Sequence, residues 1–466
     1  MTIRKSFANL WRPWGLRVIL VLAFGLRLGV CCTRSEQLEV DVDHYRGIAE
    51  QVVAGRGYAD PRSGHPTAYR PPAYVGLIAI VLWLSGGAAA IGVAQSLLGA
   101  ATVWLTERIA CRLGLGTWSL LAAALVAVDP LLLVYTASLM TETLATFLVV
   151  LVLWLAMRDR NSSRLASLVI GVACGLACLC RPGFWFFVAL LALGWLGGLL
   201  AGRRTNGRRR LAGDSWPVIA GFALSVAPWL LRNLLVIGAP ILTTTHGGYT
   251  LLLANNPVYY QEVVARPFGT VWSGASLADW QRDTEARLVA ELGHGADEVA
   301  RDRWMSGEAW RSIVSQPGRF LQAVLLRWRM LVNVLPLGSQ AMRMNPRLLL
   351  GVWIVESCLL WLSAVGLIGL ACTRGAWEPM FTNRFGGPAS PLEAAGFRAA
   401  PSPKWFPIVA LPLSLLIVHS LYWTDTRMRA PAVPALALLA CVGAATLCRI
   451  VFKSTPPGSR SPSSRY

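Results

Sequence analysis

Long apolar runs, separated by short polar loops, occupy most of this 466-residue chain. A helix of about 17 to 25 apolar residues is long enough to cross the hydrocarbon core of a bilayer. Inside the bilayer each backbone amide and carbonyl must be paired within the protein, and a helix provides that pairing. Ten runs reach or approach this length: Gly15–Cys32, Ala88–Ala110, Trp118–Tyr135, Thr143–Met157, Leu165–Cys180, Phe184–Ala201, Trp216–Ile237, Leu348–Cys372, Trp405–Leu421 and Ala430–Val451. The sequence therefore predicts an all-α polytopic membrane protein, a bundle of ten transmembrane helices.

The charge of the chain fits this membrane interpretation. Only 14% of the residues are charged, against about 25% in soluble domains. The net charge of +19 could suit nucleic acid, but the arginines gather in short loops between apolar runs, as in Arg203-Arg204 and Arg208-Arg209-Arg210. Such loops are typical of the cytoplasmic side of a multispanning protein. We therefore expect membrane lipids, and no nucleic acid, among the partners.

The same bias of positive charge predicts the topology. A basic N-terminus precedes the first run, and no cleavage site of a signal peptide follows it. The apolar stretch Ala73–Ser85 has only 13 residues, too few to cross unaided. If it lies on the outer face as a re-entrant or interfacial helix, the arginine clusters after it all face the cytoplasm. We expect a multi-pass protein of the plasma (inner) membrane with both termini in the cytoplasm; a crossing by residues 73–85 is the alternative.

This topology divides the chain into four parts. An N-terminal transmembrane module covers residues 1–237 and includes an outer loop, 33–87, here called the first loop. Residues 238–347, here called the outer segment, are predicted to be helical, and residues 348–452 hold the C-terminal transmembrane helices. The tail 453–466 is rich in Ser, Pro and Arg, a composition typical of disorder. Because the outer parts contain most of the unusual polar residues, we expect a site facing the periplasm or outside.

Three acidic residues of the outer parts are candidates for chemistry. Asp41 and Asp43 come just before a helical pattern, Tyr45–Ala54, where a carboxylate can serve as an N-cap or favour the first turn. A carboxylate at a membrane interface can also act as a general base and take a proton from an attacking hydroxyl. Glu142 lies between two apolar runs, and a carboxylate that points into a membrane bundle needs a partner and usually has a function. We expect Glu142 to hold the attacking hydroxyl, or a divalent ion, opposite Asp41.

Five arginines lie at the outer side, against the general bias: Arg70, Arg181, Arg232, Arg427 and Arg429. For each one alone, contact with a lipid headgroup or an ion pair with Asp425 is the ordinary role. Together they suit an anionic ligand, because a guanidinium stays charged and offers paired donors to phosphate. A lipid-linked phosphate presents that anion at the right depth, so we expect such a lipid as a partner.

The remaining polar candidates are His65, His246, Asn255 and Asn256, which we expect to face a second substrate. Each histidine is more often a loop hydrogen-bonder than a ligand, and a histidine–carboxylate metal site with Glu142 is the alternative. No metal-like Cys/His spacing, phosphate-binding glycine loop or nucleophile elbow is present in the sequence. We expect no required cofactor, with a divalent cation left open, and no soluble nucleotide-sugar site.

An ordered set of short motifs runs along nearly the whole chain. It comprises Asp41-Val42-Asp43-His44-Tyr45, Gly55-Arg56-Gly57-Tyr58, Ala68-Tyr69-Arg70-Pro71-Pro72, Thr141-Glu142, Arg181-Pro182, Pro228-Trp229 with Arg232-Asn233, Gly247-Gly248 with Asn255-Asn256-Pro257, and Arg427-Met428-Arg429-Ala430-Pro431. The set resembles the GT-C superfamily of integral-membrane glycosyltransferases. Within it, the chain is most similar to the protein O-mannosyltransferase-like and aminoarabinose-transferase-like enzymes.

The resemblance implies a membrane enzyme that takes a sugar from a polyprenyl-phosphate donor and inverts its anomeric centre. It also implies a first-loop acid as the base, four residues before an aromatic, and Asp41 has that spacing to Tyr45, with Asp43 as the other choice. The second-loop acid of the family corresponds to Glu142, and the basic residues would hold the donor phosphate. The acceptor, a hydroxyl of a protein, lipid or glycan, should contact the outer segment.

Two functions of other classes also fit a membrane bundle. A transporter or flippase for a lipid or small anion commonly has repeated halves and charges at the midplane of the membrane. Here the charges gather at one face, and no repeat is visible in the sequence. A non-catalytic scaffold that binds a partner through the outer segment would keep its function without Asp41 and Glu142.

Overall fold

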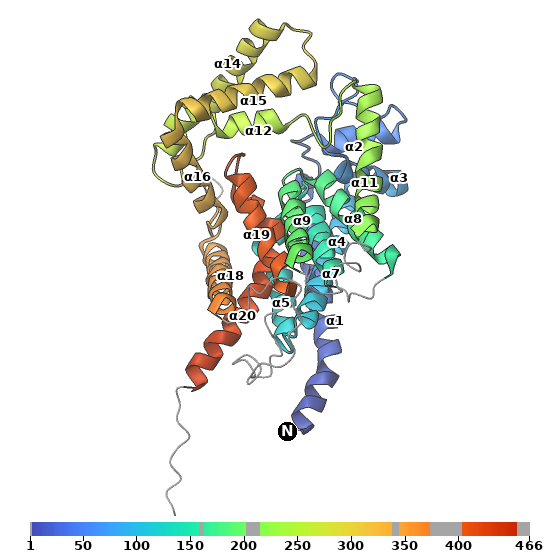
Figure 1. Ribbon diagram of the computed structural model, residues 1–466, viewed down its shortest axis with the longest axis vertical. Coiled ribbons are helices and arrows are strands. Elements are labelled where there is room, and N and C mark those ends of the chain that lie inside the picture. The colour runs from blue at the N-terminus through green and yellow to red at the C-terminus, as the bar shows by residue number, and fades with distance from the viewer. Residues whose placement is uncertain (1, 158–162, 202–214, 338–343, 373–402, 454–466) are drawn as a thin grey trace, which may run out of the picture.

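The computed structural model describes residues 2–157, 163–201, 215–337, 344–372 and 403–453. Within these ranges the chain forms helices joined by loops, and no β-strand. The transmembrane helices lie side by side as a bundle, and the outer segment lies at one end of that bundle (Figure 1). The expectation of an all-α fold is therefore confirmed. Nearly all of the tail 453–466 lies outside the described residues.

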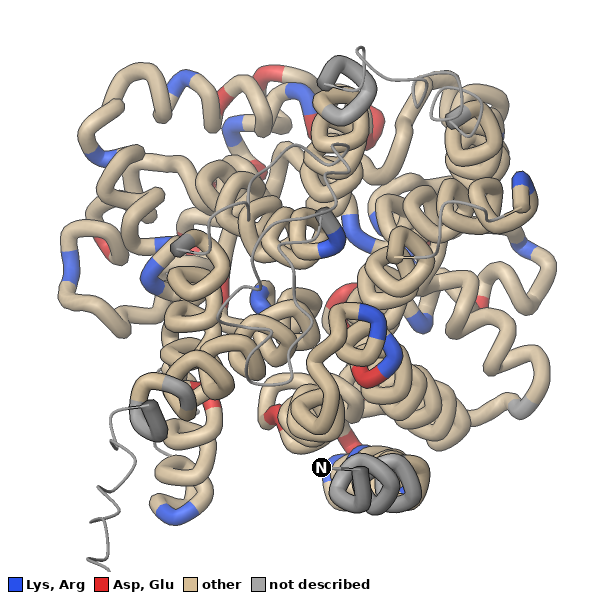
Figure 2. The backbone as a smooth tube through the Cα atoms, turned by 60° about the horizontal axis from the view of Figure 1, so that its bottom comes forward, with Lys and Arg blue, Asp and Glu red and all other residues tan. Residues whose placement is uncertain are grey.

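Each expected span corresponds to a helix or a pair of helices. The bundle helices are α1 (Thr2–Thr33), α4 (Ala88–Arg112), α5 (Trp118–Val128), α6 (Pro130–Thr136), α7 (Glu142–Ala156), α8 (Arg164–Cys180), α9 (Phe184–Ala201), α11 (Ser215–Val236), α18 (Pro346–Cys372), α19 (Phe406–His419) and α20 (Val433–Lys453). Among the described helices, five are long and apolar enough to cross a membrane, or six if the bent pair α5 and α6 is one span. The others are shorter apolar helices. Residues with charged side chains are sparse along the chain (Figure 2).

The span expected at Trp118–Tyr135 is broken into α5 and α6, which meet at an angle of 48°. Pro130 begins α6 and has no amide proton, and the Asp129 carboxylate caps α6 by accepting from a backbone amide at 2.9 Å. The buried Arg27 of α1 donates to two carbonyls at the end of α5 at 3.0 and 3.1 Å. The expected span is therefore present as a bent pair of helices, and Arg27 and Asp129 pair backbone groups at the break.

The helices α18 and α20 approach each other closely through glycine. A Cβ atom at Gly366 would lie 2.0 Å from the Leu439 carbonyl oxygen, and one at Gly443 would lie 2.0 Å from the Leu362 carbonyl oxygen. Since the driving force between helices in lipid is close packing, small residues at such a contact let the backbones meet. The C-terminal helices therefore depend on these two glycines.

The first loop contains η1 (Ser35–Leu38), α2 (Tyr45–Val53) and α3 (Pro72–Ser85). The helix α3 is the stretch expected to be re-entrant or interfacial, and it packs against α2, α4 and α8. Its far end exposes the apolar side chains of Ile80, Trp83 and Leu84, which suits contact with lipid. The first loop is thus held against the bundle by an apolar helix.

The outer segment is a helical layer above the bundle (Figure 1). Its elements are α12 (Gly247–Ala254), α13 (Pro257–Tyr259), η3 (Tyr260–Val264), α14 (Ala275–Leu292), α15 (Glu298–Ser315) and α16 (Pro317–Leu331). Buried aromatic residues, among them Tyr259, Trp272, Trp280 and Trp304, form its own core. The turn after α19 contains η5 (Thr426–Ala432), which carries the last motif of the sequence.

Candidate active site

Asp41 of the first loop has one carboxylate oxygen bound and one free. Its Oδ2 accepts from the Gly47 amide in the first turn of α2 at 2.8 Å, so it caps that helix from outside. The N-cap position itself is His44, whose φ of 60° makes the tight turn that brings Asp41 back to the helix. A Cβ at Gly47 would lie only 2.9 Å from the Pro61 side chain, so glycine at this position lets the start of α2 lie close to Pro61. Asp41 Oδ1 is buried without a hydrogen-bond partner among the described residues.

Asp43, the other first-loop acid, is occupied by Arg70. The Arg70 Nη2 binds Asp43 Oδ1 at 2.6 Å, and Arg70 Nε donates to the Asp43 carbonyl at 2.9 Å. The Arg70 guanidinium also lies over the rings of Tyr45 and Tyr69. Asp43 therefore fixes Arg70 in place, and of the two acids only Asp41 keeps a buried, unpaired oxygen.

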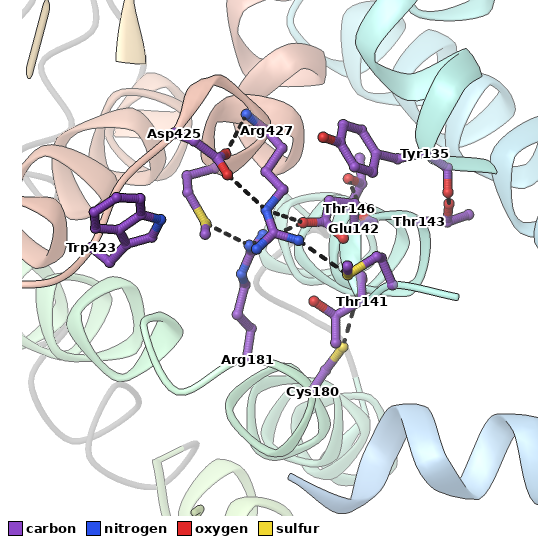
Figure 3. Close-up of polar contacts among 12 residues, drawn as sticks. Tyr135, Thr141, Glu142, Thr143, Thr146, Cys180, Arg181, Trp423, Asp425 and Arg427 are labelled. Atoms are coloured by element: carbon purple, nitrogen blue, oxygen red, sulfur yellow. Dashed lines mark hydrogen bonds and ion pairs between the residues drawn. The ribbon is translucent and has the colours of Figure 1, made fainter. Parts of the chain in front are cut away.

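A second group of charges, here called the Glu142 cluster, consists of Glu142, Arg181, Asp425 and Arg427 (Figure 3). Glu142 begins α7 with a side chain that is 1% exposed. Its Oε1 lies 3.3 Å from Arg181 Nη2 and 3.8 Å from Arg427 Nε, and Arg427 Nε also binds Asp425 Oδ2 at 3.0 Å. Three separate helix ends meet here, since Arg181 directly follows α8 and Asp425 caps η5.

The hydrogen-bonding capacity of this cluster is only partly used. Arg181 Nη1 and Glu142 Oε2 are buried without a partner among the described residues. Arg181 Nη2 faces the sulfur of Met428 at 2.8 Å, and Arg427 Nη1 faces the sulfur of Met140 at 3.0 Å. A thioether is a weak acceptor, so an oxyanion would be a stronger partner for both guanidiniums.

Tyr45 begins α2, next to the first-loop acids. The Arg70 guanidinium lies 5.3 Å from the centroid of its ring, and the ring packs edge-on against Tyr74 at 5.1 Å. Burial raises the pKa of the Tyr45 hydroxyl, Arg70 opposes this shift, and the charges of Asp43 and Glu142 add to it.

The other two expected phosphate-binding arginines are directed at protein groups. Arg232 donates to the carbonyls of Thr67 and Tyr58 at 2.8 and 2.6 Å and so holds the first loop against α11. Arg429 binds Glu356 of α18 at 2.6 Å and donates to two backbone carbonyls near the end of α16. The structure thus brings Arg181 and Arg427 together and separates Arg232 and Arg429 from them.

The four expected acceptor-side residues also have distinct places. His65 is exposed in the first loop, whereas the His246 ring lies between Tyr69 and Tyr249, with centroids 4.4 and 5.2 Å away. Burial lowers the pKa of His246 to about 3. Asn255 and Asn256 are buried, and their amide groups bind backbone carbonyls at 2.6 to 2.9 Å. These asparagines hold α12 and its surroundings rather than face a cavity.

Met140, Met428 and Glu298 are not among the residues that the sequence indicates. Met428 stands in the last motif and Met140 directly precedes Thr141-Glu142, but nothing in a methionine predicts contact with a guanidinium. Glu298 resembles an ordinary acid of a helix first turn, yet its oxygens accept from Thr67 Oγ1 at 2.8 Å and from the Ala68 amide at 2.6 Å. It therefore ties the outer segment to the first loop, a long-range contact that the sequence alone does not reveal.

The residues present do not form a metal cage. Among the described residues there is no group of three or more histidines, cysteines or carboxylates that could hold an ion. Glu142 Oε1 already lies between the guanidiniums of Arg181 and Arg427, which are themselves cations. The positive charge at this site is supplied by arginine.

No family model and no curated protein matches the sequence. Thirteen chains of solved structures match this chain, and three of them follow. The archaeal oligosaccharyltransferase AglB from Archaeoglobus fulgidus, in complex with an inhibitory peptide and a dolichol-phosphate, has 13% identity and a TM-score of 0.51 over 97% of this chain and 53% of that chain.

The apo form of the Archaeoglobus fulgidus oligosaccharyltransferase has 14% identity and a TM-score of 0.49, covering 94% of this chain and 51% of that chain. ArnT from Cupriavidus metallidurans, bound to undecaprenyl phosphate, has 14% identity and a TM-score of 0.37, covering 96% of this chain and 81% of that chain. The chain thus spans about half the length of the oligosaccharyltransferases that it resembles. The fold of the chain is similar to that of the archaeal oligosaccharyltransferase AglB, and it agrees with the helical membrane fold that the sequence motifs implied.

Proposed function

We propose that this chain transfers a sugar from a polyprenyl-phosphate donor to a hydroxyl of an acceptor at the outer face of the membrane. One observation carries the proposal. The first loop holds a buried, unpaired carboxylate oxygen on Asp41, and the Glu142 cluster holds two half-buried arginines that are only partly satisfied. A base and an oxyanion site are what such a transfer requires. The fold and the dolichol-phosphate bound to the archaeal oligosaccharyltransferase support the same donor class.

The donor phosphate is assigned to Arg181 and Arg427. As the bond from the anomeric carbon to the phosphate oxygen breaks, its electron pair stays on the phosphate, and negative charge grows there. Fixed cations at that position stabilise the transition state more than the ground state. Both arginines lie at helix ends, where a phosphate on a membrane-embedded polyprenyl chain would sit. We assign Arg70, which Asp43 fixes, to the same phosphate as a third cation.

The proton transfer is assigned to Asp41. As the acceptor oxygen forms its bond to the anomeric carbon, Asp41 Oδ1 takes the hydroxyl proton, and the displaced phosphate leaves from the opposite side. The anomeric centre is therefore inverted. Asp41 Oδ2 stays bound to the Gly47 amide, which holds the carboxylate in one orientation. Glu142, which shares its oxygen with both arginines, orients the phosphate site and the incoming hydroxyl.

This assignment needs no metal, because the arginines neutralise the leaving group. A divalent cation at Glu142 is the remaining alternative. Incubation with EDTA is expected to leave turnover unchanged, and a loss that Mn²⁺ or Mg²⁺ restores would assign the role to a metal.

The proposed side of the membrane can be tested at Cys32, which is exposed at the end of α1 that we assign to the outer face. A membrane-impermeant maleimide added to intact cells should label Cys32, and labelling only after lysis would reverse the topology.

The proposed function is tested by donor turnover. The protein in nanodiscs is offered a panel of polyprenyl-phosphate sugars together with a membrane-extract acceptor fraction, and free polyprenyl phosphate is measured. Release with one donor supports a transferase. In sealed vesicles, movement of the intact donor across the bilayer without release would instead support the transporter alternative. Unchanged binding of a partner protein in the absence of any turnover would support the scaffold.

A further inference from the structure

A hollow with a volume of about 340 Å³ lies between the outer segment and the first loop, and here we call it the outer pocket. Side chains of α14 and α15 form one wall, and Tyr249 of α12 forms another. Tyr69 of the first loop completes the lining. The pocket is therefore built from two parts of the chain that are far apart in the sequence.

The outer pocket is connected by hydrogen bonds to the loop that carries the proposed base. Glu298, in its wall, binds both Thr67 Oγ1 and the Ala68 amide, and the Thr245 amide donates to the Ala68 carbonyl at 3.0 Å. Tyr69 follows directly, and the next residue, Arg70, holds Asp43. A group bound in the pocket would thus lie beside the loop segment 67–70, whose Arg70 holds Asp43.

Two threonine hydroxyls of the pocket lack partners. Thr245 is 7% exposed and Thr284 is 3% exposed, and the Oγ1 of each is buried without a hydrogen bond among the described residues. Burying a hydroxyl without a partner is unfavourable, so both are explained if a ligand completes their bonding. A hydroxyl can both donate and accept, which suits a partner that also carries hydroxyl groups.

The rest of the lining combines aromatic faces with planar polar groups. Trp280 and Tyr249 supply the faces, and the Gln281 amide donates to the Tyr249 hydroxyl at 2.7 Å. A saccharide ring has the matching surface, with apolar C–H faces for the aromatic rings and hydroxyls at its edge for amides, carboxylates and threonines.

The charge of the lining selects against anions. Its ionisable groups are three carboxylates, Glu285, Glu298 and Asp302, against the single guanidinium of Arg301. Burial raises the pKa of Asp302, and the nearby charge of Glu298 raises it further. A phosphate or uronate would meet the same repulsion between like charges.

We propose that the outer pocket binds a neutral saccharide ring of the acceptor, so that the acceptor of the proposed transfer is a glycan or glycolipid. This inference rests on the proposed function for its role, but saccharide binding itself can be measured without any transfer. The pocket would hold one ring of the acceptor while another hydroxyl of the same molecule reaches Asp41.

Binding is tested by saturation-transfer NMR on the full chain in nanodiscs. The probes are the methyl glycosides of glucose, mannose and galactose, with methyl glucuronide as the anionic counterpart and trilysine as a cationic peptide. Thr245→Val and Thr284→Val together remove both hydroxyls at constant shape. Because those hydroxyls are unpaired, the variant should melt no lower than the wild type. Thr270→Val is the matched control, since Thr270 bonds to the Pro267 carbonyl outside the pocket.

The wild type should saturate at least one neutral glycoside and not the glucuronide, and the double variant should weaken that binding about tenfold, as expected for a lost hydrogen bond. Thr270→Val should bind as the wild type does. Saturation of trilysine alone, equal binding of glucuronide and glucoside, or unchanged binding in the double variant would overturn the proposal. Glycoside binding without donor turnover would refute the proposed transferase function but support saccharide binding in the outer pocket. Donor turnover without glycoside binding would support the transferase function and refute saccharide binding.

Discussion

Replacing Arg181 and Arg429 separately by glutamine distinguishes a substrate-binding arginine from a structural one. Both are basic residues that the sequence predicts to lie at the outer side, with the same role in binding phosphate. In the structure Arg181 has a buried, unpaired Nη1 and bonds only to Glu142 and a thioether. Arg429 leaves its Nε unpaired but gives Nη1 and Nη2 to Glu356 and two carbonyls. Arg181→Gln should therefore lower mainly turnover, and Arg429→Gln should lower mainly stability.

The expected magnitudes follow from what each change leaves behind. Without Arg181, Glu142 keeps Arg427 at 3.8 Å, so the loss of stability should be only about 1 to 2 kcal/mol. Without Arg429, the Glu356 carboxylate, 4% exposed, loses its ion-pair partner, and breaking such a buried pair costs about 3 to 5 kcal/mol. Removal of one donor to a developing oxyanion lowers turnover by about 10² to 10³.

The assay combines two readings on the same nanodisc sample. Tryptophan fluorescence during heating gives the stability, and release of polyprenyl phosphate per folded molecule gives the turnover. We expect Arg181→Gln to melt near the wild type and turn over slowly. Arg429→Gln should melt much lower, with the folded fraction turning over at nearly the wild-type rate. Near-wild-type turnover in Arg181→Gln, or slow turnover in fully folded Arg429→Gln, would refute the assignment.

Two further predictions concern stability. Burial lowers the pKa of His246 in the folded chain to about 3, from 6.5 in the unfolded chain. Between these two pH values the unfolded chain binds more protons than the folded one, so the stability should fall as the pH drops from 6.5 towards 3. The fall is at most about 1.4 kcal/mol per pH unit. His246→Phe should melt with a weaker dependence on acid pH than the wild type, and an identical dependence would contradict this. Gly443→Leu should destabilise the α18–α20 contact, because its Cβ would meet a carbonyl oxygen at 2.0 Å. Leu413→Ala, on an exposed position of α19, is the control, and equal melting of the two variants would show that the close approach is unimportant.

Much of the fold could be predicted because it depends on local composition. Apolar runs and their length determine where helices form in a bilayer, and each expected span has its helix. The break at Asp129-Pro130 is the exception, since it requires Arg27, about a hundred residues away, to pair the freed carbonyls. A single-sequence pattern contains no information about that contact.

The candidate site was predictable in residue type but not in residue role. Acids and arginines at the ends of helices identify the region. Asp41, Glu142 and Arg181 each keep a buried atom without a partner, and Arg427 faces a thioether. That Arg429 serves α18 instead depends on Glu356, which the sequence places inside an apolar run with no sign of its partner.

The most direct test of the whole account is the single-turnover rate of Asp41→Asn beside that of the wild type. Asparagine keeps an oxygen that can accept from the Gly47 amide, so α2 should remain capped and the protein folded. It has no basic oxygen, so release of polyprenyl phosphate should fall by about 10² to 10⁴. A melting temperature equal to that of the wild type, with this loss of rate, is the predicted result. Release from folded Asp41→Asn within a few-fold of the wild type would show that Asp41 is not the base.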